Sequence, residues 1–288
     1  MGHPPLTHRS LPEWIRVKRI QLNEERAMKR LLREAHLPTI CEEARCPNRT
    51  ECFGCGTATF LILGTHCTRN CGFCSVDHGV EEGVSPTEAE GLVQAARALR
   101  LHYVVLTVVT RDDLPDGGAG HMALCIRRLK EELPRVRVEI LSSDLKGKKE
   151  DIAAVLSAKP DVFGHNIETV ERLTPRVRPG AHYRRSLDVL REARILAPAV
   201  LIKSGLMVGL GETEEEIFST LNDIRTAGCD IVTIGQYLQP DRNCLPVEDY
   251  WEPEAFERWK KKALSLGFSH VFSGPFVRSS YKAHEVFS

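Results

Sequence analysis

"TATFLILGTHCTRNCGFC", residues 57 to 74, joins a run of apolar and β-branched residues to three closely spaced cysteines. The run at 57–63 predicts a buried β-strand, because β-branched and aromatic residues favour the pleated surface of a sheet. Cys67, Cys71 and Cys74 follow it in a C-x3-C-x2-C spacing. The stretch therefore predicts a strand that leads directly into a loop with three potential metal ligands.

This strand opens a regular alternation of strands and helices. Further strands are predicted at 103–109, 136–141, 161–166, 200–208 and 230–235, with a short strand-like segment at 270–273. Helical patterns are predicted at 86–100, 118–132, 148–158, 184–197, 212–227 and 253–266. Apolar strands that alternate with helices favour a parallel α/β sheet covered by helices. We expect a partial (β/α)6 barrel of the TIM type; an open, doubly wound sheet is the alternative.

Three segments are expected along the chain, with no linker long enough to separate two large domains. Residues 1–56 form an N-terminal extension with a short amphipathic helix at 23–36 and a cysteine-containing loop. Residues 57–268 form the barrel, and residues 269–288 form a C-terminal segment. Active sites of parallel barrels lie at the carboxyl ends of the strands, so the cysteine loop after the first strand marks the expected site.

Composition excludes several classes of protein. The chain has 39 basic and 39 acidic residues, a balance that indicates neither a nucleic-acid nor a membrane partner. No apolar run approaches the roughly 18 to 20 residues of a membrane span, and the N-terminus lacks the apolar segment of a signal peptide. We expect a cytoplasmic protein, in a reducing compartment where disulfides are rare.

Seven of the ten cysteines fall within 34 residues, and six of these seven form two triplets, a clustering that indicates metal ligation. Cys41, Cys46 and Cys52 form one triplet, and the C-x3-C-x2-C motif forms the second. Zinc and cubane iron–sulfur sites usually take four ligands, so each triplet is incomplete. Three thiols within eight residues favour an iron–sulfur cluster; zinc with a further Cys or His ligand is the alternative. The other four, by default small buried side chains, are Cys55, Cys125, Cys229 and Cys244.

C-x3-C-x2-C is also the signature of the radical S-adenosylmethionine (SAM) superfamily, in which an aromatic residue such as Phe73 commonly precedes the third cysteine. There the fourth iron is left open for the amino and carboxylate groups of SAM, whose cleavage gives a 5′-deoxyadenosyl radical. Nearly the whole chain resembles one family of that superfamily, the lipoyl synthases. The resemblance is carried, in order, by "PEWIRVK", "CEEARCPNRTEC", "GTATFLILG", "CTRNCGFC", "RDDLPDGGA", "HNIETV", "VRPGAHY", "KSGLMVGLGE", "TIGQYLQP" and "SGPFVRSSY".

The resemblance implies a sulfurtransferase that inserts two sulfur atoms, at C6 and C8, into a protein-bound octanoyl-lysine. It also implies that both triplets are incomplete by design. The first would hold an auxiliary [4Fe–4S] cluster that is consumed as the sulfur source, with a serine of the Arg-Ser-Ser-Tyr motif as fourth ligand. Ser280 is the first choice for this oxygen ligand, Ser279 the second, and Arg278 is expected to support the site. A serine is a harder ligand for iron than a thiolate, which suits a cluster that is dismantled.

Several side chains are candidates for contact with SAM. Asn166 and Glu168 are expected to hold its ribose hydroxyls; the alternative for Glu168 is a favourable acid at a helix start. Lys203, inside an apolar strand, is expected either to neutralise the cofactor carboxylate or to pair with Glu168. Phe73 and Gln236 complete the cofactor-binding set. Arg111 in "RDDLPDGG" is expected in a turn; the alternative is that it faces the substrate.

The expected partners follow from the family. The substrate would be an octanoylated lipoyl carrier domain, of the glycine-cleavage H protein or 2-oxoacid dehydrogenase E2 type. A ferredoxin or flavodoxin would supply electrons, and an iron–sulfur carrier would rebuild the auxiliary cluster. The competing hypotheses are a radical enzyme that adds sulfur or methylthio groups to a small molecule or tRNA, and an electron-transfer protein.

Some positions depart from the pattern typical of the family, and they bear on substrate choice and rate because strand-end loops shape the acyl site. Cys55 is also a candidate for accidental ligation when the cluster is rebuilt. The departing positions are Phe53, Cys55, Thr65, Val108, Thr110, Asp241 and Cys244.

Overall fold

The computed structural model describes residues 12–16, 57–80 and 83–287 of the chain. Within them, one parallel sheet has the strand order β1-β4-β5-β6-β7-β8-β9. The strands are β1 (Thr57–Ile62), β4 (Tyr103–Val108), β5 (Arg137–Leu141), β6 (Val162–Gly164), β7 (Leu201–Val208), β8 (Ile231–Gln236) and β9 (His270–Gly274). Spatial order follows chain order without reversal, so the doubly wound alternative is wrong and the partial barrel is confirmed.

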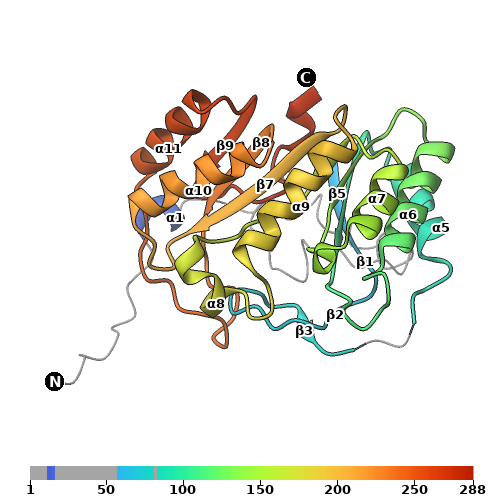
Figure 1. Ribbon diagram of the computed structural model, residues 1–288, viewed down its shortest axis with the longest axis horizontal. Helices are drawn as coiled ribbons and strands as arrows, with labels where there is room; N and C mark the ends of the chain where they lie inside the picture. The colour runs from blue at the N-terminus through green and yellow to red at the C-terminus, as the bar shows by residue number, and fades with distance from the viewer. Residues whose placement is uncertain (1–11, 17–56, 81–82, 288) are drawn as a thin grey trace.

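Helices cover the outer face of the sheet (Figure 1). They are α5 (Glu88–Ala98), α6 (Ala119–Glu132), α7 (Lys149–Ser157), α9 (Tyr183–Leu196), α10 (Glu214–Thr226) and α11 (Pro253–Ser265). Each lies within two residues of its predicted bounds. The clearest is α10, where Thr213 and Glu216 form a reciprocal capping box and Gly228 follows the end with φ of 95°.

Shorter elements complete the described part of the chain. They are α1 (Glu13–Arg16), β2 (His66–Cys67), β3 (Asp77–His78), α8 (Thr174–Val177) and the 3₁₀ turns η1 (Leu145–Gly147), η2 (Glu171–Leu173) and η3 (Ala283–Phe287). No helix within the described ranges is long and apolar enough to cross a membrane. The helix predicted at 23–36 lies outside the described residues.

The pleat of each strand divides its side chains between two environments. In β4, Val104 and Leu106 belong to the large core between sheet and helices. Tyr103 and Val105 face the barrel interior, where they pack against Ala283 of η3. The interior therefore has a layer at the strand starts that the C-terminal segment fills, and a layer at the strand ends that remains open as a cavity.

Candidate functional site

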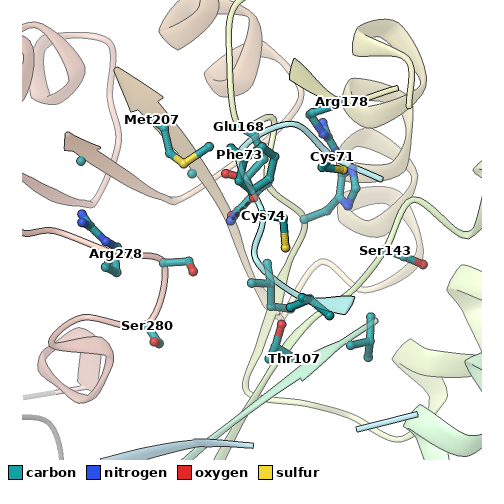
Figure 2. A pocket seen from close by; sticks show the side chains of 18 of the residues that line it. Cys71, Phe73, Cys74, Thr107, Ser143, Glu168, Arg178, Met207, Arg278 and Ser280 are labelled. Carbon is teal, nitrogen blue, oxygen red and sulfur yellow. Dashed lines mark hydrogen bonds between the residues drawn. The ribbon is translucent and has the colours of Figure 1, made fainter. Parts of the chain in front are cut away.

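A cavity of about 530 Å³ lies at the carboxyl ends of the strands (Figure 2). Its apolar walls include Leu61 of β1, Val105 of β4 and Leu141 of β5. The three cysteines of the second triplet, Glu168, Arg178 and the segment 277–280 also line it. Residues far apart in the chain thus meet at the end of the barrel where the sequence predicts the active site.

The cysteine loop is held by backbone contacts on both of its sides. The short strands β2 and β3 pair at its two ends, with Cys67 opposite His78. The Gly72 amide donates to the Val177 carbonyl at 2.9 Å, and the Gly72 carbonyl accepts from the Leu245 amide at 2.7 Å. Cys67 Sγ accepts from the Thr110 amide at 3.3 Å. The loop is therefore fixed to α8, to the segment after β4 and to the loop after β8 before any metal binds.

The three thiols form a donor set that suits iron. Burial raises the pKa of Cys71 to about 11, although the Arg178 and Arg69 charges oppose this. Burial raises the pKa of Cys74 to about 12. Without a metal, Cys71 and Cys74 stay protonated near neutral pH, and a metal that binds them must release the protons. Three thiols on one cavity wall, with two cations beside them, fit a cluster that has one iron open to a ligand.

Glu168 and Asn166 follow β6 and line the cavity, and Glu168 lies close to Phe73 of the cysteine loop (Figure 2). The Glu168 amide donates to the Gly205 carbonyl at 2.9 Å, and its carbonyl accepts from the Met207 amide at 2.9 Å. This bridge to β7 holds Glu168 at a φ of 67°, which aims its side chain into the cavity. Glu168 precedes η2 and is not in the first turn of a helix, so the helix-start alternative is wrong.

Asn166 fixes the Glu168 carboxylate by donating Nδ2–H to Oε1 at 2.9 Å. The Asn166 and Thr233 side chains pass over Gly205, where a Cβ atom would come within 2.8 Å of Asn166 Oδ1 and 2.7 Å of Thr233 Oγ1. Burial raises the pKa of Glu168, and the Arg178 charge opposes that shift. The pair presents a desolvated carboxylate and an amide to the cavity, a combination that can accept from hydroxyl groups.

Arg178 lies beside Cys71 and Glu168 (Figure 2), and no role for it was predicted from the sequence. It is 7% exposed, and Nη1 donates to the Ile167 carbonyl at 2.9 Å and to Ser186 Oγ at 3.2 Å. Burial lowers its pKa, while Glu168 and Cys71 oppose this. The only sequence signal was its place in the "VRPGAHY" motif.

Arg69 and His165 were also missed. Arg69, inside the cysteine loop, pairs with Asp112 and with Asp144, each at 2.7 Å. Burial would raise the pKa of Asp144, but the hydrogen bond and charge of Arg69 outweigh it and hold that pKa at about 2. Burial and then the Arg178 charge lower the pKa of His165 to about 4, so this cavity histidine is neutral.

The C-terminal motif forms the wall opposite the cysteine loop. Val277, Arg278, Ser279 and Ser280 line the same cavity as Cys71 and Cys74. The backbone passes directly over β8, where a Cβ atom on Gly235 would lie 2.1 Å from the Val277 carbonyl. The structure thus brings Ser280 and Arg278 to the second triplet's cavity. The first triplet, Cys41, Cys46 and Cys52, lies outside the described residues.

Two predicted cofactor contacts have other partners. Lys203 pairs with Glu139 at 2.7 Å, not with Glu168, and both side chains are almost fully buried. The reason is the strand period: Lys203 shares the inner face of β7 with Gly205, but two residues nearer the strand start and below the cavity. Gln236 does line the cavity, yet its amide donates to the Asp249 carbonyl at 2.9 Å and accepts from the Trp251 amide at 3.0 Å.

Arg111 lies in the predicted turn and does not line this cavity, so the alternative that it faces a substrate there is wrong. It is 1% exposed, and Nη1 donates to the Leu63 carbonyl at 3.1 Å and to the Gly83 carbonyl at 3.0 Å. Its guanidinium also pairs with Asp113 at 2.7 Å. Arg111 therefore ties the end of β1 to the turn before α6.

Known proteins share both the sequence and the fold. Residues 61–224 match the family model of the radical SAM superfamily. "Lipoyl synthase" of Rubrobacter xylanophilus is 52% identical over 274 residues, which cover 95% of this chain and 85% of that protein. "Lipoyl synthase" of Caldicellulosiruptor saccharolyticus is 51% identical over 276 residues, which cover 95% of this chain and 96% of that protein.

Solved structures agree at the level of the fold. The crystal structure of methylornithine synthase (PylB) matches with a TM-score of 0.57 at 17% identity, over 88% of this chain and 82% of that one. HydG, a maturase of the [FeFe]-hydrogenase, matches with a TM-score of 0.55 at 12% identity, over 79% of this chain and 61% of that one. At such low identity these matches establish the partial barrel alone.

Proposed function

The chain belongs to the lipoyl synthase family of the radical SAM superfamily, and on that premise we propose how its cavity serves the reaction. The reaction is the insertion of two sulfur atoms, at C6 and C8, into a protein-bound octanoyl group. The observation that carries the proposal is that Cys71, Cys74 and Ser280, from opposite ends of the described chain, line one cavity.

Two [4Fe–4S] clusters and SAM are the cofactors of this family. Cys67, Cys71 and Cys74 would hold the cluster that binds SAM, and Cys41, Cys46, Cys52 and Ser280 would hold the auxiliary cluster. When bound, these groups supply an electron for SAM cleavage and the sulfur that is transferred. Their position on the cavity wall supports this assignment for the second triplet and for Ser280.

The chain's own residues bind and orient the polar cofactor. Asn166 and Glu168 would accept from the ribose hydroxyls of SAM, since both present oxygen atoms to the cavity and are already fixed by β7. Arg178 replaces Lys203 as the buried cation of this site, because it lies beside Cys71 and Glu168. Its charge favours the thiolate form of Cys71. Phe73 lines the cavity and, like Met207, packs against a small cluster of buried apolar residues.

The inner wall suits an acyl chain. Leu61, Val105, Val109 and Leu141 present an apolar surface within the cavity, and most of these side chains are buried against the sheet. An apolar wall binds a hydrocarbon by removing it from water, and it excludes water from carbon radicals that would otherwise react elsewhere. Val108 and Thr110, which depart from the family pattern, also line this cavity and would tune acyl binding.

The partners and the division of the chain complete the proposal. Lipoyl carrier domains of the H-protein and E2 types present the octanoyl group, a ferredoxin or flavodoxin supplies electrons, and an iron–sulfur carrier rebuilds the auxiliary cluster, all in the cytoplasm. Residues 1–56 contribute the auxiliary cysteines, 57–268 the barrel and 269–288 the segment that closes the auxiliary site. The equal numbers of acidic and basic residues support a protein substrate over a tRNA.

The test is an anaerobic reaction of protein reconstituted with iron and sulfide. Reductant, SAM and an octanoyl-lysine peptide are added, and the peptide is analysed by mass spectrometry. We expect a gain of two sulfur atoms together with 5′-deoxyadenosine. Deoxyadenosine without sulfur gain, on both H-protein and E2 peptides, would contradict the proposed acyl site while leaving the radical chemistry intact.

A further inference from the structure

The C-terminal turn η3 lies at the opposite end of the barrel from the cysteine loop (Figure 1, dark red at the C label, with β2 and β3 at the other end). Its side chains contact the first residues of several strands. The partners at those strand starts are Thr57 of β1, Tyr103 of β4, Arg137 of β5, Val162 of β6 and Ile231 of β8. Strand starts define the amino-terminal mouth of a parallel barrel, so η3 closes that mouth.

Each contact of η3 is of a different kind. Ala283 is 0% exposed and packs inside the barrel against Tyr103 and Val105. His284 Nδ1 lies 3.2 Å from Thr57 Oγ1, at hydrogen-bonding distance. The Phe287 ring lies 6.2 Å from the Tyr103 ring and 4.8 Å from the Arg137 guanidinium carbon. Val286 packs with Val162 and Ile231. The docking combines apolar burial, a hydrogen bond and ring contacts around one short turn.

The surface that receives η3 is itself rigid. Tyr103 donates its hydroxyl to Glu139 Oε2 at 2.7 Å, and Lys203 donates to Glu139 Oε1 at 2.7 Å. These three side chains, from β4, β5 and β7, are each no more than 2% exposed. A buried ion pair with a third hydrogen bond has its charges satisfied and holds its partners in one geometry.

A chain of tight turns joins this docked end to Ser280. The Tyr281 amide donates to the Arg278 carbonyl at 3.0 Å, and the Ala283 amide donates to the Ser280 carbonyl at 3.4 Å. The Glu285 amide then donates to the Lys282 carbonyl at 3.0 Å. Lys282 adopts a φ of 53°, in the left-handed region that a lysine rarely occupies. Such a backbone persists only where the contacts on either side of it impose it.

We propose that η3, docked in the amino-terminal mouth of the barrel, is the clasp that positions Ser280 in the cavity at the other end. The clasp residues His284 and Phe287 act on the auxiliary site through the backbone and touch neither cofactor nor substrate. This rests on the proposed role of Ser280 as a ligand. A weakened clasp lets Ser280 leave more often, so the auxiliary cluster is lost faster while the SAM-binding cysteines are unaffected.

The experiment uses the holoenzyme with both clusters and measures how fast an iron chelator bleaches each of them under anaerobic conditions. Phe287→Ala and His284→Ala test the clasp, and Ser280→Ala reports the effect of losing the ligand itself. Leu264→Ala on α11 is the matched control, because Leu264 is 47% exposed and Phe287 is 39% exposed. Hydrogen exchange of the amides of 278–285 is followed in the same proteins, so that undocking is observed independently.

We expect Phe287→Ala to accelerate loss of the auxiliary cluster by roughly five- to thirtyfold, with His284→Ala in the same direction and Leu264→Ala unchanged. Hydrogen exchange at 278–285 should rise in the clasp variants, and SAM cleavage per chain should stay at the wild-type rate. Wild-type cluster loss in both clasp variants, with acceleration in Ser280→Ala, would overturn the clasp alone. Wild-type cluster loss in Ser280→Ala would overturn the serine ligand, and the clasp with it.

Discussion

Both ends of the barrel bury charged side chains, but they use them differently. At the amino-terminal mouth, Lys203 and Tyr103 both donate to Glu139, and none of these three residues lines the cavity. At the carboxyl ends, Glu168 and Arg178 line the cavity, and within the described part of the chain Glu168 receives one side-chain hydrogen bond, from Asn166. This difference shows that a buried charged side chain indicates a ligand site only where part of it is exposed to a cavity.

The largest effect is expected at the carboxyl end, from Cys71→Ala. Removal of one thiol from the second triplet should reduce SAM cleavage by more than roughly 100-fold. Loss of a residue that only hydrogen-bonds to a metal ligand costs up to roughly 100-fold, and Cys71 would itself be a ligand. Iron per chain should fall by about half while the fold remains. Formation of 5′-deoxyadenosine and iron content are the measurements.

Cys244→Ala is the matched control for that variant. Cys244 Sγ lies 3.4 Å from the Cys74 carbonyl, on the loop that packs against the cysteine loop, yet it belongs to neither triplet. We expect its removal to leave SAM cleavage intact. If Cys244→Ala lost the cluster while Cys71→Ala kept it, the ligand set would be wrong.

Substitutions at the amino-terminal mouth should change the stability of the fold and leave the binding of SAM unchanged. Lys203→Met leaves Glu139 buried without its cation, which should lower the free energy of unfolding by about 3–5 kcal/mol. The double variant Lys203→Met/Glu139→Leu removes both charges and should recover most of that loss. Urea unfolding measures both effects. Loss of SAM binding in a fully folded Lys203→Met protein would instead restore Lys203 as a cofactor contact.

Lys203 also marks where sequence reasoning ends. Periodicity of apolar residues correctly predicted each strand and helix of the barrel, because those elements arise from local patterns. The strand period places Lys203 on the inner face of β7. It specifies neither the depth of Lys203 along the barrel nor its pairing with Glu139 on β5, which is separated from β7 by β6. Arg178 was missed for a related reason: it lies in a loop, and only tertiary contacts bring it to Cys71.

The C-terminal segment shows the same limit. The motif around Ser280 was predicted at the active site from the resemblance, and it does line the cavity. The docking of η3 had no sequence signal, because a five-residue 3₁₀ turn has no amphipathic period and its partners start five different strands. Long-range contacts of short, irregular segments are what local patterns omit.

His165, which lines the cavity, should make the stability of the fold depend on pH. The folded protein keeps His165 neutral, with a pKa of about 4 against an ordinary 6.5, because of burial and the Arg178 charge. The unfolded chain therefore binds the proton first as pH falls. The contribution of His165 to the free energy of unfolding should be constant above pH 6.5. As pH falls toward 4, the free energy of unfolding should decrease by about 3 kcal/mol in total.

His165→Gln isolates this contribution. Glutamine keeps a donor and an acceptor for the Ser142 carbonyl and Ser186 Oγ but does not titrate. Urea unfolding of wild type and variant between pH 4 and 7 should give a flatter pH dependence for the variant. Asp144, with a pKa of about 2, contributes stability that is present above its ordinary 3.8 and is lost mainly as pH falls below that value, outside this range. An equal slope in the two proteins would show that other groups carry the dependence.

The smallest effect is expected from Glu168→Gln, and it tests the open face of the carboxyl end most directly. If Glu168 accepts from a ribose hydroxyl, the neutral amide should weaken SAM binding about tenfold, which corresponds to about 1.4 kcal/mol. Glu171→Gln is the control, because Glu171 lies three residues later, is exposed, and pairs with Arg184 at 2.8 Å outside the cavity. Equilibrium binding of SAM to the reconstituted proteins distinguishes them. Equal affinities would mean that Glu168, like Lys203, is a buried charge satisfied by the protein itself, and the distinction between the two ends of the barrel would then rest on the cysteines alone.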